Sequence, residues 1–241
     1  MRPTLLCLHG WGGSKDSWTP LREALAGTDL EILAPDLPGF GAEPDPERPW
    51  TVDDYAAWVK DWLVGNRTGT GPLWVVGHSH GGRTAIVLAA KKTLDIDRLF
   101  LCAPAINRKK RYHLRRMVGA TLAGTGKFFL SIPGLSALAP FARKMLYKLL
   151  RVHDYERASP LMQRTLVLVT KDDLTPLFPS VTQPVDLFWG DKDTQTPVSD
   201  GRHMHLLLPR CDFHLYAGTR HGVHKTNARE IAAVIRQRLG S

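Results

Sequence analysis

Six short apolar runs recur along the chain, each bounded by Gly, Pro or Asp. They cover residues 4–8, 31–34, 73–76, 98–102, 185–189 and 212–216. Runs of this kind are typical of parallel strands that are buried on both faces of a sheet. Segments with helical spacing lie between them, and this alternation predicts an α/β fold in which helices cover both faces of a mostly parallel sheet.

Two of the expected helices begin with a polar residue that is followed three positions later by an acidic one. Thr51 and Asp54 precede an apolar face that is spaced as in a helix, namely Val52, Tyr55, Val59 and Trp62. Asn227 and Glu230 stand in the same relation before Ile231, Val234 and Ile235. Such pairs cap helix N-termini by exchanging side-chain and backbone hydrogen bonds. We therefore expect one helix after residue 51 and an amphipathic helix at the C-terminus.

Residues 107–180 interrupt the alternation. This segment contains several prolines and reads as short helices separated by breaks. It holds fourteen Lys and Arg residues against four Asp and Glu residues, a net charge of +10, whereas the whole chain carries +9. We interpret residues 107–180 as a helical insertion, a cap, in a core made of residues 1–106 and 181–241.

Length and hydropathy limit the class of protein. The 241 residues suffice for one well-buried core. No apolar run approaches the roughly 18 residues that a membrane-spanning helix needs, and the start of the chain does not read as a signal peptide. We expect a cytoplasmic protein without stable membrane insertion.

The strongest local motif is the run from Gly77 to Gly82, Gly-His-Ser-His-Gly-Gly, which follows one expected strand and precedes a helix-like segment. In a G-x-S-x-G elbow, glycines on both sides of the serine allow a tight, strained turn that exposes the hydroxyl group. Strand, turn and helix appear here in the required order. Ser79 is therefore the candidate nucleophile.

A second glycine-rich turn follows the first strand and reads His9-Gly10-Trp11-Gly12-Gly13. The backbone N–H groups of Trp11 and of His80, the residue after the nucleophile, are the candidate oxyanion hole, since two fixed donors stabilise charge that develops in the transition state. Phosphate binding is less consistent with this turn, because the Gly-rich phosphate motifs are absent.

A serine nucleophile needs a base and an orienting acid, which we expect after later strands. Asp191 and Asp193 follow the fifth expected strand, and His221 follows the sixth. Either aspartate is also suited to capping the next helix, and of the two we favour Asp193 as the acid. We expect His9, His78 and His224 to be structural, with His9 and His224 holding loops through hydrogen bonds.

These motifs together resemble the α/β-hydrolase superfamily, in its cap-bearing esterase-like branch, over nearly the whole chain. The resemblance rests on His9-Gly10-Trp11, the Asp36-Leu37-Pro38-Gly39-Phe40-Gly41 turn, the Ser79 elbow, Gly190 three residues before Asp193, and Gly218 three residues before His221. It implies a serine carboxylic-ester hydrolase with Ser79, Asp193 and His221 as the triad. Members usually begin with an antiparallel hairpin that this chain lacks, so we expect a reduced sheet of about six strands.

In related hydrolases the cap lies over the active site, which implies that substrate choice resides in residues 107–180. Phe128 and Phe129 are candidates to line an acyl pocket, and equally to form the core of the cap. The basic cluster of the cap is a candidate surface for binding a substrate or a partner. It consists of Arg108, Lys109, Lys110, Arg111, Arg115 and Arg116. A carboxylated or phosphorylated substrate, an anionic membrane surface or an acidic acyl carrier protein fits this charge, whereas no recognition motif indicates nucleic acid.

The acyl carrier protein is favoured by a further resemblance. Pimeloyl-acyl carrier protein methyl ester esterases, enzymes of biotin biosynthesis, are small cap-bearing hydrolases with a basic cap and a similar H-G-W loop. The resemblance implies no metal and no organic cofactor. Thioesters, lactones and other small esters are open as substrates, and so is a non-catalytic binding module on the same fold.

Overall fold

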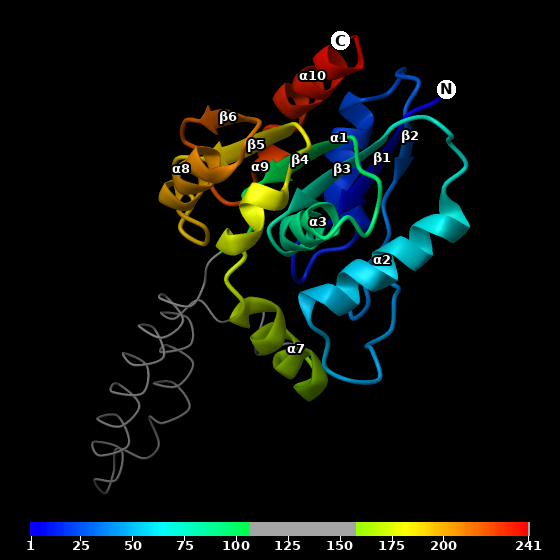
Figure 1. Ribbon diagram of the computed structural model, residues 1–241, viewed down its shortest axis with the longest axis vertical. Helices are drawn as coiled ribbons and strands as arrows, with labels where there is room; N and C mark the ends of the chain where they lie inside the picture. The colour runs from blue at the N-terminus through cyan, green and yellow to red at the C-terminus, as the bar shows by residue number, and fades with distance from the viewer. Residues whose placement is uncertain (107–157, 241) are drawn as a thin grey trace, which may run out of the picture.

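The computed structural model describes residues 1–106 and 158–240 of the chain (Figure 1). Their strands form one parallel sheet in the order β2-β1-β3-β4-β5-β6. The strands are β1 (Thr4–Leu8), β2 (Glu31–Leu33), β3 (Leu73–His78), β4 (Arg98–Cys102), β5 (Val185–Gly190) and β6 (Cys211–Tyr216). The predicted α/β class and the six-stranded parallel sheet are confirmed.

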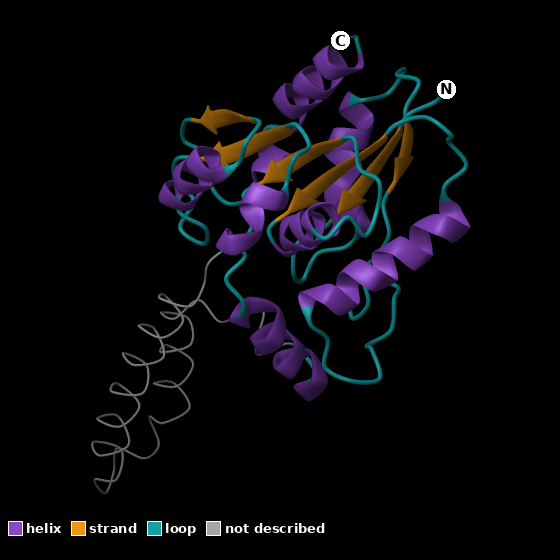
Figure 2. Ribbon diagram, in the orientation of Figure 1, coloured by secondary structure: helices purple, strands orange, loops and turns teal. Residues whose placement is uncertain are grey.

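Helices cover the sheet on both sides (Figure 2). The α-helices are α1 (Thr19–Ala24), α2 (Val52–Asn66), α3 (His80–Ala90), α7 (Pro160–Lys171), α8 (Val198–Leu207), α9 (Val223–Thr226) and α10 (Ala228–Leu239). Two 3-10 helices, η1 (Lys15–Trp18) and η3 (Thr175–Ser180), complete the described elements. None of the helices in the described ranges has both the length and the apolar character needed to cross a bilayer.

The period-2 alternation of strand side chains builds two hydrophobic layers. In β1, Leu6 and Leu8 join the layer under α2 and α3, whereas Leu5 and Cys7 join the layer under α1 and α10. All four side chains are fully buried. Burying both faces of a strand explains its continuous apolar sequence. The edge strand β6 departs from the expected burial, because its residues are only partly buried or exposed.

The two predicted helix caps have different outcomes. The Thr51 hydroxyl accepts a hydrogen bond from the Asp54 N–H, and the Asp54 carboxylate accepts one from the Thr51 N–H, so this capping box is confirmed. The C-terminal helix α10 is confirmed as well, but its reciprocal cap is wrong. The Asn227 side chain makes no cap hydrogen bond, because its Oδ1 accepts one from the Thr219 hydroxyl at 2.9 Å.

The chain leaves β1 toward β2 at one edge and then runs from β3 to β6 in the other direction. The strand order therefore reverses between β1 and β3. In open α/β sheets, ligands bind outside the carboxyl ends of the strands at such a reversal. His9 and Ser79 follow β1 and β3 directly and so lie at this point.

A buried carboxylate ties the C-terminal helix to the sheet. Asp186 in β5 is fully buried, and it accepts hydrogen bonds at 2.9 Å from Arg98 of β4 and from Arg238 of α10. His214 Nε2 of β6 also lies 2.9 Å away. Burial alone would raise the pKa of Asp186, but the hydrogen bonds from His214 and Arg238 outweigh it and lower this pKa below its usual value.

Replacing this carboxylate should cost stability. We expect Asp186→Asn to lower the free energy of unfolding by about 3 kcal/mol, because it leaves the partly buried Arg98 and Arg238 without their counter-charge. The matched control is Asp212→Asn, which removes an exposed carboxylate from the same Arg238 and should cost less than about 1 kcal/mol. Urea unfolding at pH 7 measures the free energy of unfolding of both variants. Equal losses in the two would contradict the stabilising role of the buried Asp186 carboxylate.

The lowered pKa of Asp186 also predicts how the stability of the fold depends on pH. A carboxyl group whose pKa is lower in the folded than in the unfolded chain stabilises the fold above its unfolded pKa of about 3.9 and loses this effect as the pH falls toward the folded value. The stability difference between wild type and Asp186→Asn should therefore shrink as the pH falls below about pH 4.

Candidate active site

The turn between β3 and α3 holds Ser79 in a strained conformation. Its backbone angles are φ 50° and ψ −106°, in the left-handed region that non-glycine residues rarely occupy. A side chain at Gly81 would place its Cβ 2.1 Å from the Leu8 carbonyl oxygen, and one at Gly77 would clash with the Gly81 carbonyl. Only glycine fits at these two positions, which explains the G-x-S-x-G spacing.

Hydrogen bonds from the neighbouring strand hold the strained turn. The Ser79 N–H donates to the Cys102 carbonyl, and the Ser79 carbonyl accepts from the N–H groups of Ala105 and Arg83, each at 3.1 Å. The serine backbone is thus bound on the β4 side and within its own helix. Such over-determination is what allows strain to persist at a site.

The loops after β5 and β6 bring Asp193 and His221 together. His221 Nδ1 lies 2.7 Å from Asp193 Oδ2, and the Asp193 side chain is fully buried. A Cβ at Gly190 would lie 2.2 Å from the Thr219 carbonyl oxygen, so this close approach of the two loops requires glycine. Asp191 is exposed, and the described structure thus places Asp193 rather than Asp191 against the histidine.

The environment of Asp193 keeps its carboxylate charged. Burial alone would raise its pKa, but the hydrogen bond with His221 and those from Thr196 outweigh this effect, so the pKa lies below its usual value. The N–H groups of Gln195 and Thr196 donate to Oδ1 at 2.8 and 2.9 Å. A charged, fixed carboxylate can orient an imidazole and stabilise its protonated form.

The histidine loop lies against the nucleophile turn. His78 Nε2 lies 3.0 Å from the His221 carbonyl oxygen, and the two rings are 4.7 Å apart between centroids. Within the described residues, the Ser79 hydroxyl and the His221 ring are not hydrogen-bonded to each other. Catalytic hydrogen bonds are often long in ligand-free sites and tighten when substrate binds.

The glycine-rich turn after β1 passes directly over the nucleophile turn. A Cβ at Gly10 would lie 3.3 Å from Ser79 Cβ and 2.6 Å from His78 Nδ1. Trp11 follows, and its ring packs edge-on against His80 with centroids 5.6 Å apart. His80 is the first residue of α3, where backbone N–H groups point out of the helix end rather than to helix carbonyls. The structure therefore brings both predicted oxyanion-hole residues next to Ser79.

Three further histidines near this site, His9, His78 and His224, are buried, and burial lowers the pKa of each. His9 accepts a hydrogen bond from the Leu37 N–H at 2.9 Å, and its Nδ1 lies 2.8 Å from the Gly10 carbonyl oxygen, so its predicted loop-holding role is confirmed. His224 stacks on His78 with centroids 3.8 Å apart. Burial lowers the pKa of His224 to about 3 and that of His78 well below its usual value. The prediction of hydrogen bonds for His224 is wrong, since its ring nitrogens have no partner among the described residues.

A narrow pocket is lined by Ser79. Its lining residues come from the core and from α7 and are Trp11, Ser79, His80, Arg83, Ala105, Leu166, Val169 and Thr170. The predicted acyl-pocket residues Phe128 and Phe129 lie outside the described residues. The basic cluster is also outside them, with Arg108, Lys109, Lys110, Arg111, Arg115 and Arg116.

Comparison with protein families decides the identity of the fold. The family model described as the alpha/beta hydrolase fold matches residues 3–228. The chain belongs to the α/β-hydrolase family. It is accordingly a hydrolase-type enzyme, as the resemblance implied.

Individual relatives of this α/β hydrolase are distant. An uncharacterized protein of Mycobacterium tuberculosis is 26% identical over 91% of this chain and 70% of its own length. A pimeloyl-acyl carrier protein methyl ester esterase of Neisseria meningitidis serogroup B is also 26% identical, over 95% of this chain and 90% of its own length. The structure of a thermophilic esterase from Thermogutta terrifontis aligns with a TM-score of 0.69 and 22% identity, covering 99% of this chain and 89% of that protein.

Two residues of this α/β-hydrolase site were missed in the sequence. The Thr196 hydroxyl donates to Asp193 Oδ2 at 2.8 Å and lies 3.1 Å from His221 Nδ1, so it touches both members of the pair. Arg83 lines the pocket although it lies in a helix of small and apolar residues. A charged residue in such a helix is visible in the sequence and could have indicated that Arg83 has a specific role. No group of three potential metal ligands occurs among the residues described.

Proposed function

We propose that this α/β hydrolase is a serine carboxylic-ester hydrolase that works through an acyl-enzyme on Ser79. The observation that carries the proposal is the buried Asp193–His221 pair at 2.7 Å, held against the strained Ser79 turn at the point where the strand order reverses. A nucleophile, a base and an orienting acid placed in this way form the recurrent apparatus of acyl transfer.

The proposed mechanism has two halves. Ser79 Oγ attacks the ester carbonyl while His221 Nε2 takes its proton, and His221 then gives this proton to the leaving alcohol. Water, activated by the same histidine, hydrolyses the acyl-enzyme and regenerates the serine. Asp193 holds His221 Nδ1 and stabilises the imidazolium, while the N–H groups of Trp11 and His80 stabilise the oxyanion.

The finer proposal concerns the substrate. An acyl carrier protein-linked methyl ester, such as pimeloyl-acyl carrier protein methyl ester, is supported by the esterases of that name among the relatives and by the net charge of +10 in residues 107–180. A basic surface attracts an acidic carrier protein through long-range electrostatics. In this proposal residues 107–180 form the cap, and Arg108 to Arg111 contact the carrier.

Charge reversal tests both levels of the proposal. A variant with glutamate at positions 108–111 should hydrolyse p-nitrophenyl butyrate like wild type but lose at least about tenfold in kcat/KM on the carrier-linked ester, with a weaker salt dependence. The matched control reverses Arg202 and Arg210, which are exposed at α8 and after it.

The outcomes separate the alternatives. If the 108–111 variant loses activity equally on both esters, or on neither, the proposed carrier-linked substrate is contradicted. The protein is then a hydrolase of small esters, thioesters or lactones. A folded wild type that hydrolyses neither ester would contradict the esterase and favour a non-catalytic binding module.

A further inference from the structure

One side chain binds the backbone just before the inserted segment 107–180 and again near the end of that segment. Arg83 lies one turn after Ser79 in α3 and is almost completely buried, at 1% exposure. Its Nη1 donates to the carbonyls of Ala105 and Ile106 at 2.5 and 3.2 Å, and its Nη2 donates to the carbonyl of Asp172 at 2.6 Å. A planar guanidinium group suits such divergent acceptors, because its five N–H donors point in fixed directions.

The first of these contacts connects Arg83 to the nucleophile. Ala105 gives its carbonyl to Arg83 and its N–H to the Ser79 carbonyl. Arg83 also donates its own backbone N–H to that same Ser79 carbonyl. The guanidinium group is thus part of a short hydrogen-bonded ring that includes the backbone of Ser79. A displacement at one member of such a ring is transmitted to the others, because a close-packed interior resists deformation.

The second contact fixes the end of α7. Asp172 is the C-cap residue of this helix, and the last carbonyls of a helix have no N–H partner within it. Arg83 supplies such a partner and also brings positive charge to the negative end of the helix dipole. Along the rest of α7, Thr165 Oγ1 accepts from the Trp50 N–H at 3.1 Å, and the Ser159 hydroxyl donates to Asp45 at 2.5 Å. In Figure 1, α7 lies beside the N-terminal end of α2.

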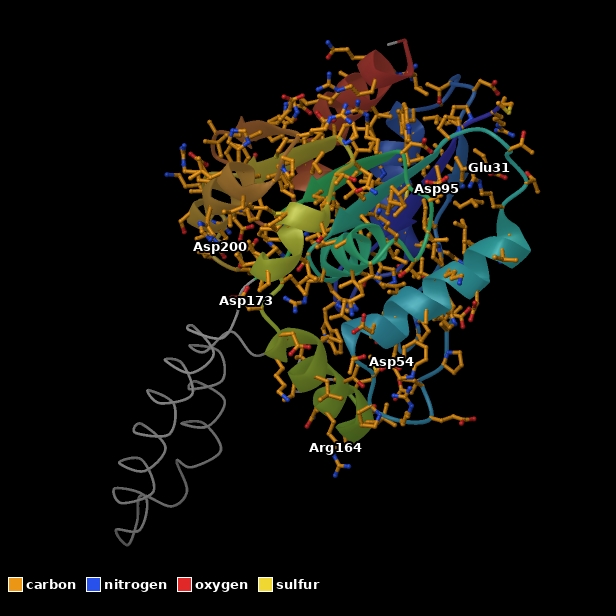
Figure 3. The ribbon with its side chains drawn as sticks, viewed as in Figure 1. Glu31, Asp54, Asp95, Arg164, Asp173 and Asp200 are labelled. Carbon is orange, nitrogen blue, oxygen red and sulfur yellow. The ribbon has the colours of Figure 1, made fainter. Side chains whose placement is uncertain are left out.

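The two faces of α7 differ. Leu166, Val169 and Thr170 line the pocket over Ser79, and Val169 is buried. Val167 is 41% exposed on the outside, and Arg164 points away from the core into solvent (Figure 3). The pocket therefore has a core side, formed by Trp11 and Ser79 among others, and an α7 side that is apolar apart from one threonine.

We propose that Arg83 is a positioning residue that sets the distance of α7 from Ser79, and that the inner face of α7, through Leu166 and Val169, restricts the acyl group of the substrate to short chains. This inference rests on the proposed esterase function and deepens it, since it assigns acyl-chain selectivity to α7. A pocket wall held at three places along its length acts as a fixed limit rather than a surface that adapts to each substrate.

The test is the acyl-chain profile of four variants, measured as kcat/KM for p-nitrophenyl esters from acetate to octanoate. Val169→Ala and Arg83→Met should raise the octanoate-to-butyrate ratio by at least about tenfold, the effect of one or two methylene groups of added space. Arg83→Lys, which keeps the charge without the planar fork, should lie between Arg83→Met and wild type. Val167→Ala, on the outer face, is the matched control and should keep the wild-type ratio.

A merely structural Arg83 gives a different result, because loss of stability lowers kcat/KM for all esters in the same proportion and leaves the ratio unchanged. An unchanged ratio in Val169→Ala and Arg83→Lys overturns the inference even if Arg83→Met does not fold. A wild type that hydrolyses no ester overturns the proposed function and this inference together. A wild type that is active on esters, with unchanged ratios in the variants, overturns the inference alone.

Discussion

Replacing Ser79 by alanine is expected to lower kcat for p-nitrophenyl butyrate by about 10⁶-fold, the loss found when a serine nucleophile is removed from a complete triad. His221 and Asp193 act through the serine that attacks, so little activity survives without it. KM should change much less, because the hydroxyl group contributes little to ground-state binding. Steady-state kinetics measure the effect, with Ser199→Ala, at an exposed serine of α8, as the control.

The fold should tolerate the Ser79 substitution. Alanine carries the same Cβ as serine and meets the same strain at φ 50°, so the thermal unfolding midpoint should stay near that of wild type. A folded Ser79→Ala protein that retains more than about one-hundredth of the wild-type kcat would contradict the assignment of the nucleophile.

Replacing Asp193 by asparagine should lower kcat by about 10⁴-fold. Asparagine has nearly the shape of aspartate, but its NH₂ group can turn toward His221 Nδ1 and favour the tautomer that cannot take the serine proton. The imidazolium that forms during attack also loses its counter-charge. The site contains three donors to the Asp193 carboxylate, from Gln195 and Thr196, so the side chain stays in place and the effect is chemical.

The matched control for this substitution is Asp191→Asn. Asp191 lies in the same loop but is exposed, and kcat should stay near the wild-type value. Measuring both variants on one ester decides between the two aspartates that the sequence offered. A large loss in Asp191→Asn together with a small loss in Asp193→Asn would overturn the structural assignment.

The strands and the nucleophile turn were predictable because their determinants are local. A buried parallel strand needs a short apolar run, and β1, β3 and β4 follow such runs closely. The Ser79 turn needs glycines at fixed offsets, and Gly77 and Gly81 are present for the steric reason that the structure shows. Local rules of this kind can be read from one sequence.

The contacts that depend on distant parts of the chain were not predictable. Arg83 donates to carbonyls that lie 22 and 89 residues away in the sequence, and no local sequence pattern indicates such partners. The cap expected at Asn227 failed for the same reason, because Thr219 in a different loop takes the side-chain oxygen. The sequence favoured Asp193 over Asp191 and the resemblance agreed through Gly190, whereas in the structure the choice follows from which carboxylate meets His221.

The α7 side of the pocket shows a related limit. The sequence predicted only short helices in this segment, whereas the inner face of α7 is placed by distant residues. A Cβ at Gly39 would lie 2.3 Å from Met162 Cε, and the Trp50 N–H donates to Thr165. Phe128 and Phe129 were predicted to line an acyl pocket, whereas Leu166 and Val169, which line the pocket over Ser79, were not predicted. The roles of Phe128 and Phe129 stay predictions.

Covalent labelling with a fluorophosphonate, followed by mass spectrometry of the digested protein, tests the central claim most directly. The reagent reacts with an activated serine and mimics the first half of acyl transfer. We predict one label per chain, located on Ser79 and absent from Ser79→Ala. A folded wild type that takes up no label, or a label on any other residue, would contradict the claim that this chain is a serine hydrolase acting through Ser79.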